Sequence, residues 1–138
     1  MNTKTLISGL AGGVVVFLAG YVVYGMIMMD YFMSNMISYP GLMKDPMDLW
    51  AMAVGNIILG ILLAYVLNLG GVVSASRGAT IGAIVFFLIG LSVNLVMYAQ
   101  MNMSPLQICF VDAICMAVLG ALAGTVIGWM QGRSAATV

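Results

Sequence analysis

Four long apolar stretches constrain the fold of this chain more than any other feature of its sequence. They cover approximately residues 5–29, 49–69, 79–100 and 106–130. An α-helix rises about 1.5 Å per residue, so about 20 residues are needed to cross the hydrocarbon core of a bilayer. Each stretch is long enough, and only 6% of the residues are charged, which is too few for the surface of a soluble domain. The sequence therefore predicts one all-α membrane domain, residues 1–138, with four transmembrane helices.

The connections between these stretches are short, which predicts that neighbouring helices are antiparallel and form an up-down-up-down bundle. A weak internal repeat favours two tandem helical hairpins. The segment GVVVFLAGYVVY (13–24) aligns without gaps on AIVFFLIGLSVN (83–94), and Asn56 falls less clearly on Asp112. Apolar helices also resemble one another by chance, so the alignment leaves both a duplication and a coincidence open.

The few charged residues predict an orientation in the membrane. Lys4, Arg77 and Arg133 flank the helix ends that would share one face, whereas Lys44 lies among aspartates on the other face. Basic residues near helix ends are retained in the cytoplasm, so both termini are predicted to be cytoplasmic. Positive and negative charges are balanced and no basic cluster is present, which argues against nucleic acid as a partner.

A carboxyl group interrupts the fourth stretch at FVDAIC (110–115). A charged aspartate at the centre of a membrane helix costs about 2.5 to 3.5 kcal/mol on insertion scales, so Asp112 should face the protein interior. Counted from the outer ends of their stretches at about 1.5 Å per residue, Asp112, Asn94 and Tyr24 lie about 9 to 10 Å deep. Asn56 lies about 15 Å from Pro46 by the same count.

The sequence therefore predicts a polar pocket in the outer half of the bundle, centred on Asp112. Its predicted members are Asp112, Asn94, Asn56, Tyr24 and Tyr98. Two interpretations are open. These groups can simply hydrogen-bond the helices to one another, or they can bind a small solute, a proton or an ion.

Small residues recur along one stripe of each helix, mostly in the cytoplasmic half. Such stripes let helix backbones approach closely, and this drives packing where lipid removes the hydrophobic incentive. The predicted packing positions are Gly120, Gly124, Gly128, Gly60, Gly82, Gly90 and Gly13. The spacing does not say whether the partner helix belongs to the same chain or to a second copy.

Sulfur-containing residues are numerous but do not predict a metal site. Most of the fourteen methionines lie near the outer face, and thioethers are ligands for Cu(I). Methionine is also a common filler of adaptable apolar surfaces, and the chain has no histidine, so we expect neither a metal nor a cofactor. Cys109 and Cys115 lie six residues apart on different faces of one helix and are expected to be buried, unpaired thiols.

Two segments carry a resemblance to a known family. GYVVYGMIMMDYFM (20–33) has a Gly-x-x-x-Tyr-Gly step before an outer aromatic, and FVDAICMAVLGALAGTVIGW (110–129) has an aspartate followed by small residues and a tryptophan. In both respects the chain resembles a family of small four-helix bacterial integral membrane proteins of unknown function. The resemblance implies the fold and the orientation, hence a multi-pass protein of the inner membrane, and it implies no activity.

Catalysis is the least favoured class, because the chain has no histidine or glutamate and no nucleophile beside a base. We expect a non-enzymatic helix-packing protein that self-associates as a homo-oligomer or serves as an accessory subunit of a larger membrane assembly. The alternative is a protein that binds or transports a small solute, proton or ion through the pocket around Asp112.

Overall fold

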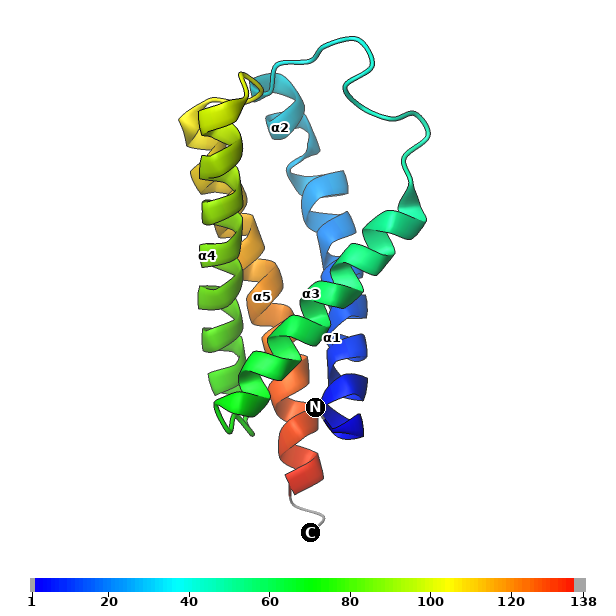
Figure 1. The fold of residues 1–138 in the computed structure, drawn as a ribbon, viewed down its shortest axis with the longest axis vertical. Helices are drawn as coiled ribbons and strands as arrows, with labels where there is room; N and C mark the ends of the chain where they lie inside the picture. The colour runs from blue at the N-terminus through cyan, green and yellow to red at the C-terminus, as the bar shows by residue number, and fades with distance from the viewer. Residues whose placement is uncertain (1, 136–138) are drawn as a thin grey trace.

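Residues 2–135 are described by the structure, a computed structural model, and their regular structure is helical (Figure 1). The elements in chain order are α1 (Thr3–Val22), the π-helix η1 (Val23–Ile27), α2 (Met29–Asn35), α3 (Leu49–Leu69), α4 (Ala75–Gln100) and α5 (Leu106–Ala135). Among the described residues, four helical segments are long and apolar enough to cross a membrane: Thr3–Ile27, Leu49–Leu69, Ala75–Gln100 and Leu106–Arg133. The predicted all-α fold with four helices of transmembrane length is confirmed.

The four long helices alternate in direction and form two hairpins. One hairpin pairs α1 with α3, the other pairs α4 with α5, and α1 also packs on α5 to join them. The start of α1, the end of α5 and the turn 70–74 lie at one end, here called the terminus end (Figure 1). Residues 36–48 and 101–105 lie at the opposite end, here called the loop end (Figure 1).

Glycines bring the backbones of α4 and α5 into direct contact. A Cβ atom added to Gly82 would overlap the carbonyl oxygen of Gly120, and one added to Gly78 would overlap that of Gly124. Gly128 lies against the backbone of Ser74, and further along α4 Gly90 faces Met116 and Ala113 of α5. The predicted stripe of small residues on α5 therefore packs against α4 of the same chain over most of its length.

The contact between α1 and α3 also depends on glycine, but it is shorter. A Cβ atom at Gly13 would lie 2.5 Å from Cα of Ile57, and one at Gly60 would overlap the backbone of Gly13. Gly9 packs on the same part of α3, with Cα of Ile61 only 2.8 Å from the position of its Cβ. From this crossing α3 leans away from the other helices toward the loop end (Figure 1).

The apolar core lies in the half of the bundle near the terminus end. Its buried members come from all four long helices and the turn 70–74, and they include Val16, Leu63, Leu67, Phe86 and Ile127. At the loop end, by contrast, the 13 residues from 36 to 48 form an irregular connection that carries the chain from α2 to α3. Toward this end α3 and α4 diverge (Figure 1), so the bundle is closed in one half and open in the other.

Gly124→Ala should destabilise the protein, because the added methyl group meets the backbone of Gly78, which cannot move aside as a side chain could. Overpacking of this kind costs about 1 to 3 kcal/mol. Gly55→Ala is the matched control, since its Cβ would have no neighbour within 4 Å and alanine favours helix by about 1 kcal/mol over glycine. Thermal unfolding followed with a thiol-reactive dye, which reads exposure of the buried Cys109 and Cys115, measures both variants. Equal melting temperatures for the two would contradict the packing described.

Candidate functional site

The carboxyl group of Asp112 faces the interior and joins three helical segments. The Tyr24 hydroxyl, from η1, donates to its Oδ1 over 2.8 Å. The Asn94 amide, from α4, donates to its Oδ2 over 2.5 Å. The predicted convergence of Asp112, Asn94 and Tyr24 at one depth is therefore what the structure shows.

Asn94 is held in place by its own helix. Its Nδ2 donates to the carbonyl oxygen of Gly90 over 2.8 Å as well as to Asp112. Because both neighbours are acceptors, the amide nitrogen and not the amide oxygen must point at the carboxyl group. Asp112 therefore accepts one hydrogen bond on each oxygen from a neutral donor.

Tyr24 reaches Asp112 from a local change in helix geometry. Residues 23–27 form a π-helix, in which the amide of Met28 donates to the carbonyl oxygen of Val23, five residues back. A π-turn places one extra residue in the helix and is often found at functional sites. Beyond Met28 the chain starts α2, whose Phe32 packs on the ring of Tyr24 with a centroid distance of 5.6 Å. The apolar stretch 5–29 predicts one uninterrupted helix, so the π-helix within it was not predicted from the sequence.

Two predicted members of the pocket do not contact Asp112. The amide of Asn56 donates to the Met52 carbonyl oxygen of its own helix over 2.9 Å. At this position α3 packs on α1 and makes few contacts with α4 and α5, which carry Asn94 and Asp112. Tyr98 is 46% exposed and does not line the cavity around Asp112. It lies one residue, or about 100° around the helix, beyond Met97, which does line the cavity.

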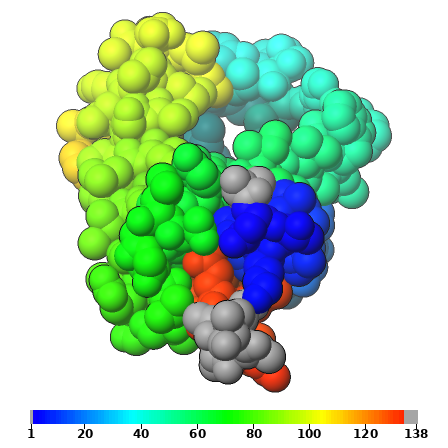
Figure 2. Space-filling view, turned by 60° about the horizontal axis from the view of Figure 1, so that its bottom comes forward, coloured from blue at the N-terminus to red at the C-terminus, as the bar shows by residue number. Residues whose placement is uncertain are grey.

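A cavity of about 1380 Å³ surrounds these groups in the loop half of the bundle. Its wall includes Tyr24, Asn94, Asp112 and Asn56, together with residues of all six helical segments and of the 36–48 connection. Figure 2 shows the hollow between α4 (yellow-green), the 36–48 connection (cyan) and α3 (green). Ligand pockets commonly measure about 300 to 1,000 Å³, so this cavity is large enough for a small organic molecule.

The wall of the cavity is mainly apolar, with two separate groups of polar residues. Methionine is its most frequent residue: Met29, Met33, Met36, Met43, Met47, Met52, Met97, Met101, Met103 and Met116. Asp112 and its partners form one polar group, between the helices. Lys44 and Asp45 belong to the other, in the exposed connection, where Lys44 pairs with Asp48.

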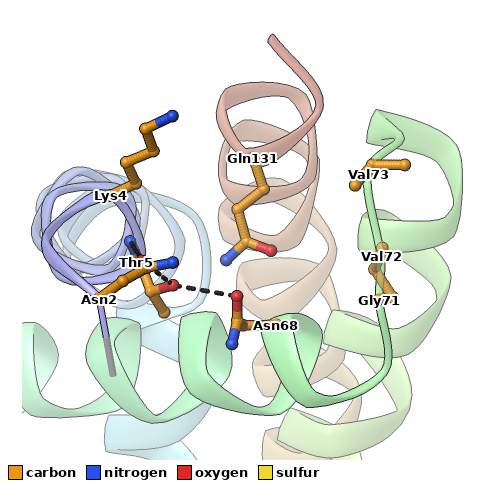
Figure 3. A pocket seen from close by; sticks show the side chains of 8 residues that line it. All are labelled: Asn2, Lys4, Thr5, Asn68, Gly71, Val72, Val73 and Gln131. Atoms are coloured by element: carbon orange, nitrogen blue, oxygen red, sulfur yellow. Dashed lines mark hydrogen bonds between the residues drawn. The ribbon is translucent and has the colours of Figure 1, made fainter. Parts of the chain in front are cut away.

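A smaller pocket of about 240 Å³ lies at the terminus end (Figure 3). The Thr5 hydroxyl lies 2.7 Å from Oδ1 of Asn2 and 3.1 Å from Oδ1 of Asn68, and can donate to either. Gln131 of α5 donates to the Ala64 carbonyl oxygen over 3.1 Å. This network ties α1, α3 and α5 together. This network was not predicted from the sequence, although polar residues at the ends of the apolar stretches could have indicated it.

Side chains that commonly bind metal ions do not cluster in the described part of the structure. Within residues 2–135, histidine, cysteine, aspartate and glutamate form no group of three or more that could hold a metal ion. Cys109 and Cys115 are free and buried, as expected.

No protein-family model, curated protein or solved structure matches this chain. The resemblance to the family of small four-helix bacterial membrane proteins therefore stays a prediction.

The hydrogen bond between Tyr24 and Asp112 can be measured with a double-mutant cycle. Tyr24→Phe and Asp112→Ala should show a coupling free energy of about 0.6 to 1.7 kcal/mol, the range found for hydrogen bonds between membrane helices. The matched cycle of Asn56→Ala with Asp112→Ala should show coupling near zero, because Asn56 bonds within its own helix. Reversible unfolding in mixed micelles gives both values. Coupling to Asn56 as large as that to Tyr24 would overturn the assigned network.

Proposed function

We propose that this protein is a non-enzymatic integral membrane protein that binds a small amphipathic molecule in the cavity of its loop half, with Asp112 at the polar end of the site. The observation that carries the proposal is the position of the carboxyl group. It lies in the wall of a large, mainly apolar cavity and is fixed there by donors from two other helical segments.

The hydrogen bonds to Asp112 fix the position of its carboxyl group but leave some of its acceptor positions unoccupied. A carboxylate has about four acceptor positions, and Tyr24 and Asn94 occupy one on each oxygen. The remaining positions are available to a ligand, since Asp112 also lines the cavity. A polar group held by its neighbours while part of it stays open is how a preorganised binding site is built.

The shape of the cavity favours a ligand that is soluble in lipid. The cavity lies where α3 and α4 diverge, in the part of the bundle flanked by helices of transmembrane length (Figure 1). A molecule dissolved in the bilayer can enter sideways between these two helices. Apolar walls with a few polar groups are the usual composition of such sites.

The glycine stripes support packing within one chain. Gly13, Gly60, Gly82, Gly90, Gly120, Gly124 and Gly128 each contact a helix of the same molecule. They therefore give no support to self-association, and we do not include it in the proposal.

For the location, we propose the bacterial inner membrane with both termini in the cytoplasm. Lys4, Arg77 and Arg133 all lie toward the terminus end, which supports this orientation. Alkaline phosphatase, which is active only outside the cytoplasm, should be active when fused within residues 36–48 and inactive when fused after Arg133. Green fluorescent protein should give the opposite pattern. The reverse pattern for both reporters would invert the orientation.

The binding proposal is tested by filling the cavity from inside. Gly20 lines the cavity, and a Cβ atom there would meet only Leu119 Cδ1 at 3.8 Å, so Gly20→Phe should occupy the space without disturbing the backbone. Nile red, a neutral dye whose fluorescence rises in apolar sites, is titrated into the protein in nanodiscs, with empty nanodiscs subtracted. The wild-type protein should show saturable binding, and Gly20→Phe should abolish it.

The matched control is Gly55→Phe, which adds the same side chain at an exposed position outside the cavity. This variant should bind Nile red as the wild-type protein does. Saturable binding that is equal in all three proteins, or absent from all three, would overturn the proposed function.

A further inference from the structure

The wall of the cavity carries more acidic than basic side chains. Of the charged residues that line it, Asp112 lies on α5 between the helices, and Lys44 and Asp45 lie in the exposed connection 36–48. Lys44 already pairs with Asp48, which lies outside the cavity wall. Among the described residues of the wall, therefore, no basic side chain stands beside Asp112 to balance its charge.

The groups that surround Asp112 in the structure are neutral. Tyr24 of η1 and Asn94 of α4 donate to it, Asn56 of α3 lines the same cavity, and Cys115 follows it on α5. An ionised carboxylate in an apolar setting is costly unless a counter-charge accompanies it. A positively charged ligand group would supply that counter-charge.

Aromatic rings line the cavity, and one of them belongs to the tyrosine that bonds to the carboxyl group. Phe17, Tyr21, Tyr24 and Phe32 line its wall from α1, η1 and α2. Tyr24 is the closest link, because its hydroxyl bonds Asp112 while its ring packs on Phe32. The faces of aromatic rings attract cations within about 6 Å, and ammonium groups without N–H donors are recognised in this way.

The rest of the wall suits an apolar body of variable shape. Methionine side chains are flexible and polarizable, and surfaces rich in them adapt to different apolar partners. A divalent metal ion would need about six oxygen ligands, whereas the described helices bring a single carboxyl group, that of Asp112, to the cavity. The wall therefore fits an organic cation better than an inorganic one.

We propose that the ligand of this cavity is a lipophilic organic cation, with its positive charge beside Asp112 and the ring of Tyr24, and its apolar groups against the methionine-lined wall. This inference rests on the proposed function and adds the charge of the ligand to it. An anion would be repelled by Asp112, and a neutral molecule would bind more weakly than a cation because it brings no counter-charge.

Three probes of nearly equal size and shape test the charge directly on the wild-type protein in nanodiscs. Tritiated tetraphenylphosphonium, a cation, is bound in a scintillation proximity assay, with empty nanodiscs subtracted. Unlabelled tetraphenylborate, an anion, and tetraphenylmethane, which is neutral, are the competitors. The expected result is saturable binding of the cation that tetraphenylborate does not displace and that tetraphenylmethane displaces only at concentrations well above those of unlabelled cation. Displacement by either competitor at concentrations equal to those of unlabelled cation would overturn the inference.

Two variants locate the charge that is responsible. Asp112→Asn keeps the shape of the side chain and should weaken binding of the cation at least about tenfold, because it removes one partner of a buried charge pair. Asp45→Asn removes the other carboxylate of the cavity wall, in the exposed connection, and should change the affinity less than about twofold. Equal affinities for the wild-type protein and Asp112→Asn would overturn the inference.

The Nile red titration separates this inference from the proposed function. If Nile red binds and Gly20→Phe blocks it while tetraphenylphosphonium shows no saturable binding, the cavity is a binding site for uncharged molecules and only the inference is wrong. If neither probe binds, both proposals are wrong.

Discussion

Close contact between helix backbones is the constraint on which the rest of this structure depends. Among lipid chains an apolar side chain gains little by leaving the solvent, so helices associate mainly where their surfaces fit closely. Here that fit is supplied by glycines, and the tightest contacts, at Gly13 with Gly60 and at Gly82 with Gly120, lie on the terminus-end side of the polar group around Asp112. The bundle is therefore tightly packed in the half near the terminus end, and the half near the loop end encloses the cavity.

The loop half is held instead by hydrogen bonds, and these do not reach α3. Tyr24 and Asn94 bond Asp112, Gln107 donates to the Tyr31 hydroxyl over 3.0 Å, and Ile37 donates to the Met103 carbonyl oxygen over 2.8 Å. The bond from Asn94 joins α4 to α5, and the other three connect the end of the first helical arm, including α2 and Ile37 beyond it, with α5 or the turn before it. Since α3 has no share in them, the cavity opens on its side.

The sequence predicts the parts of this arrangement that follow from periodicity and from the cost of polar groups in lipid. The α3 boundaries, Leu49–Leu69, agree with the predicted stretch, and Asp112 turns inward to Asn94 and Tyr24 because a carboxyl group facing lipid is costly. The errors lie where tertiary geometry decides. Asn56 is at a suitable depth, but depth along a helix says nothing about the angle at which α3 leaves its neighbours. Likewise, the extra residue that the π-helix at 23–27 adds to the helix does not change the hydropathy of the segment, so hydropathy does not predict it.

The difference between the two hairpins explains why the cavity forms on one side only. In α4 and α5, small residues continue toward the loop end as far as Gly90, which faces Ala113 and Met116, so this hairpin stays closed. In α1 and α3 the close contact between backbones stops sooner. From Gly13 and Gly60 toward the loop end, the following turns carry Phe17 on α1, and Asn56 and then Met52 on α3, and these three side chains line the cavity. Bulky side chains at these positions hold the two helices apart, which weakens the packing of this hairpin. The same side chains leave the space in which Asp112 is exposed to a ligand.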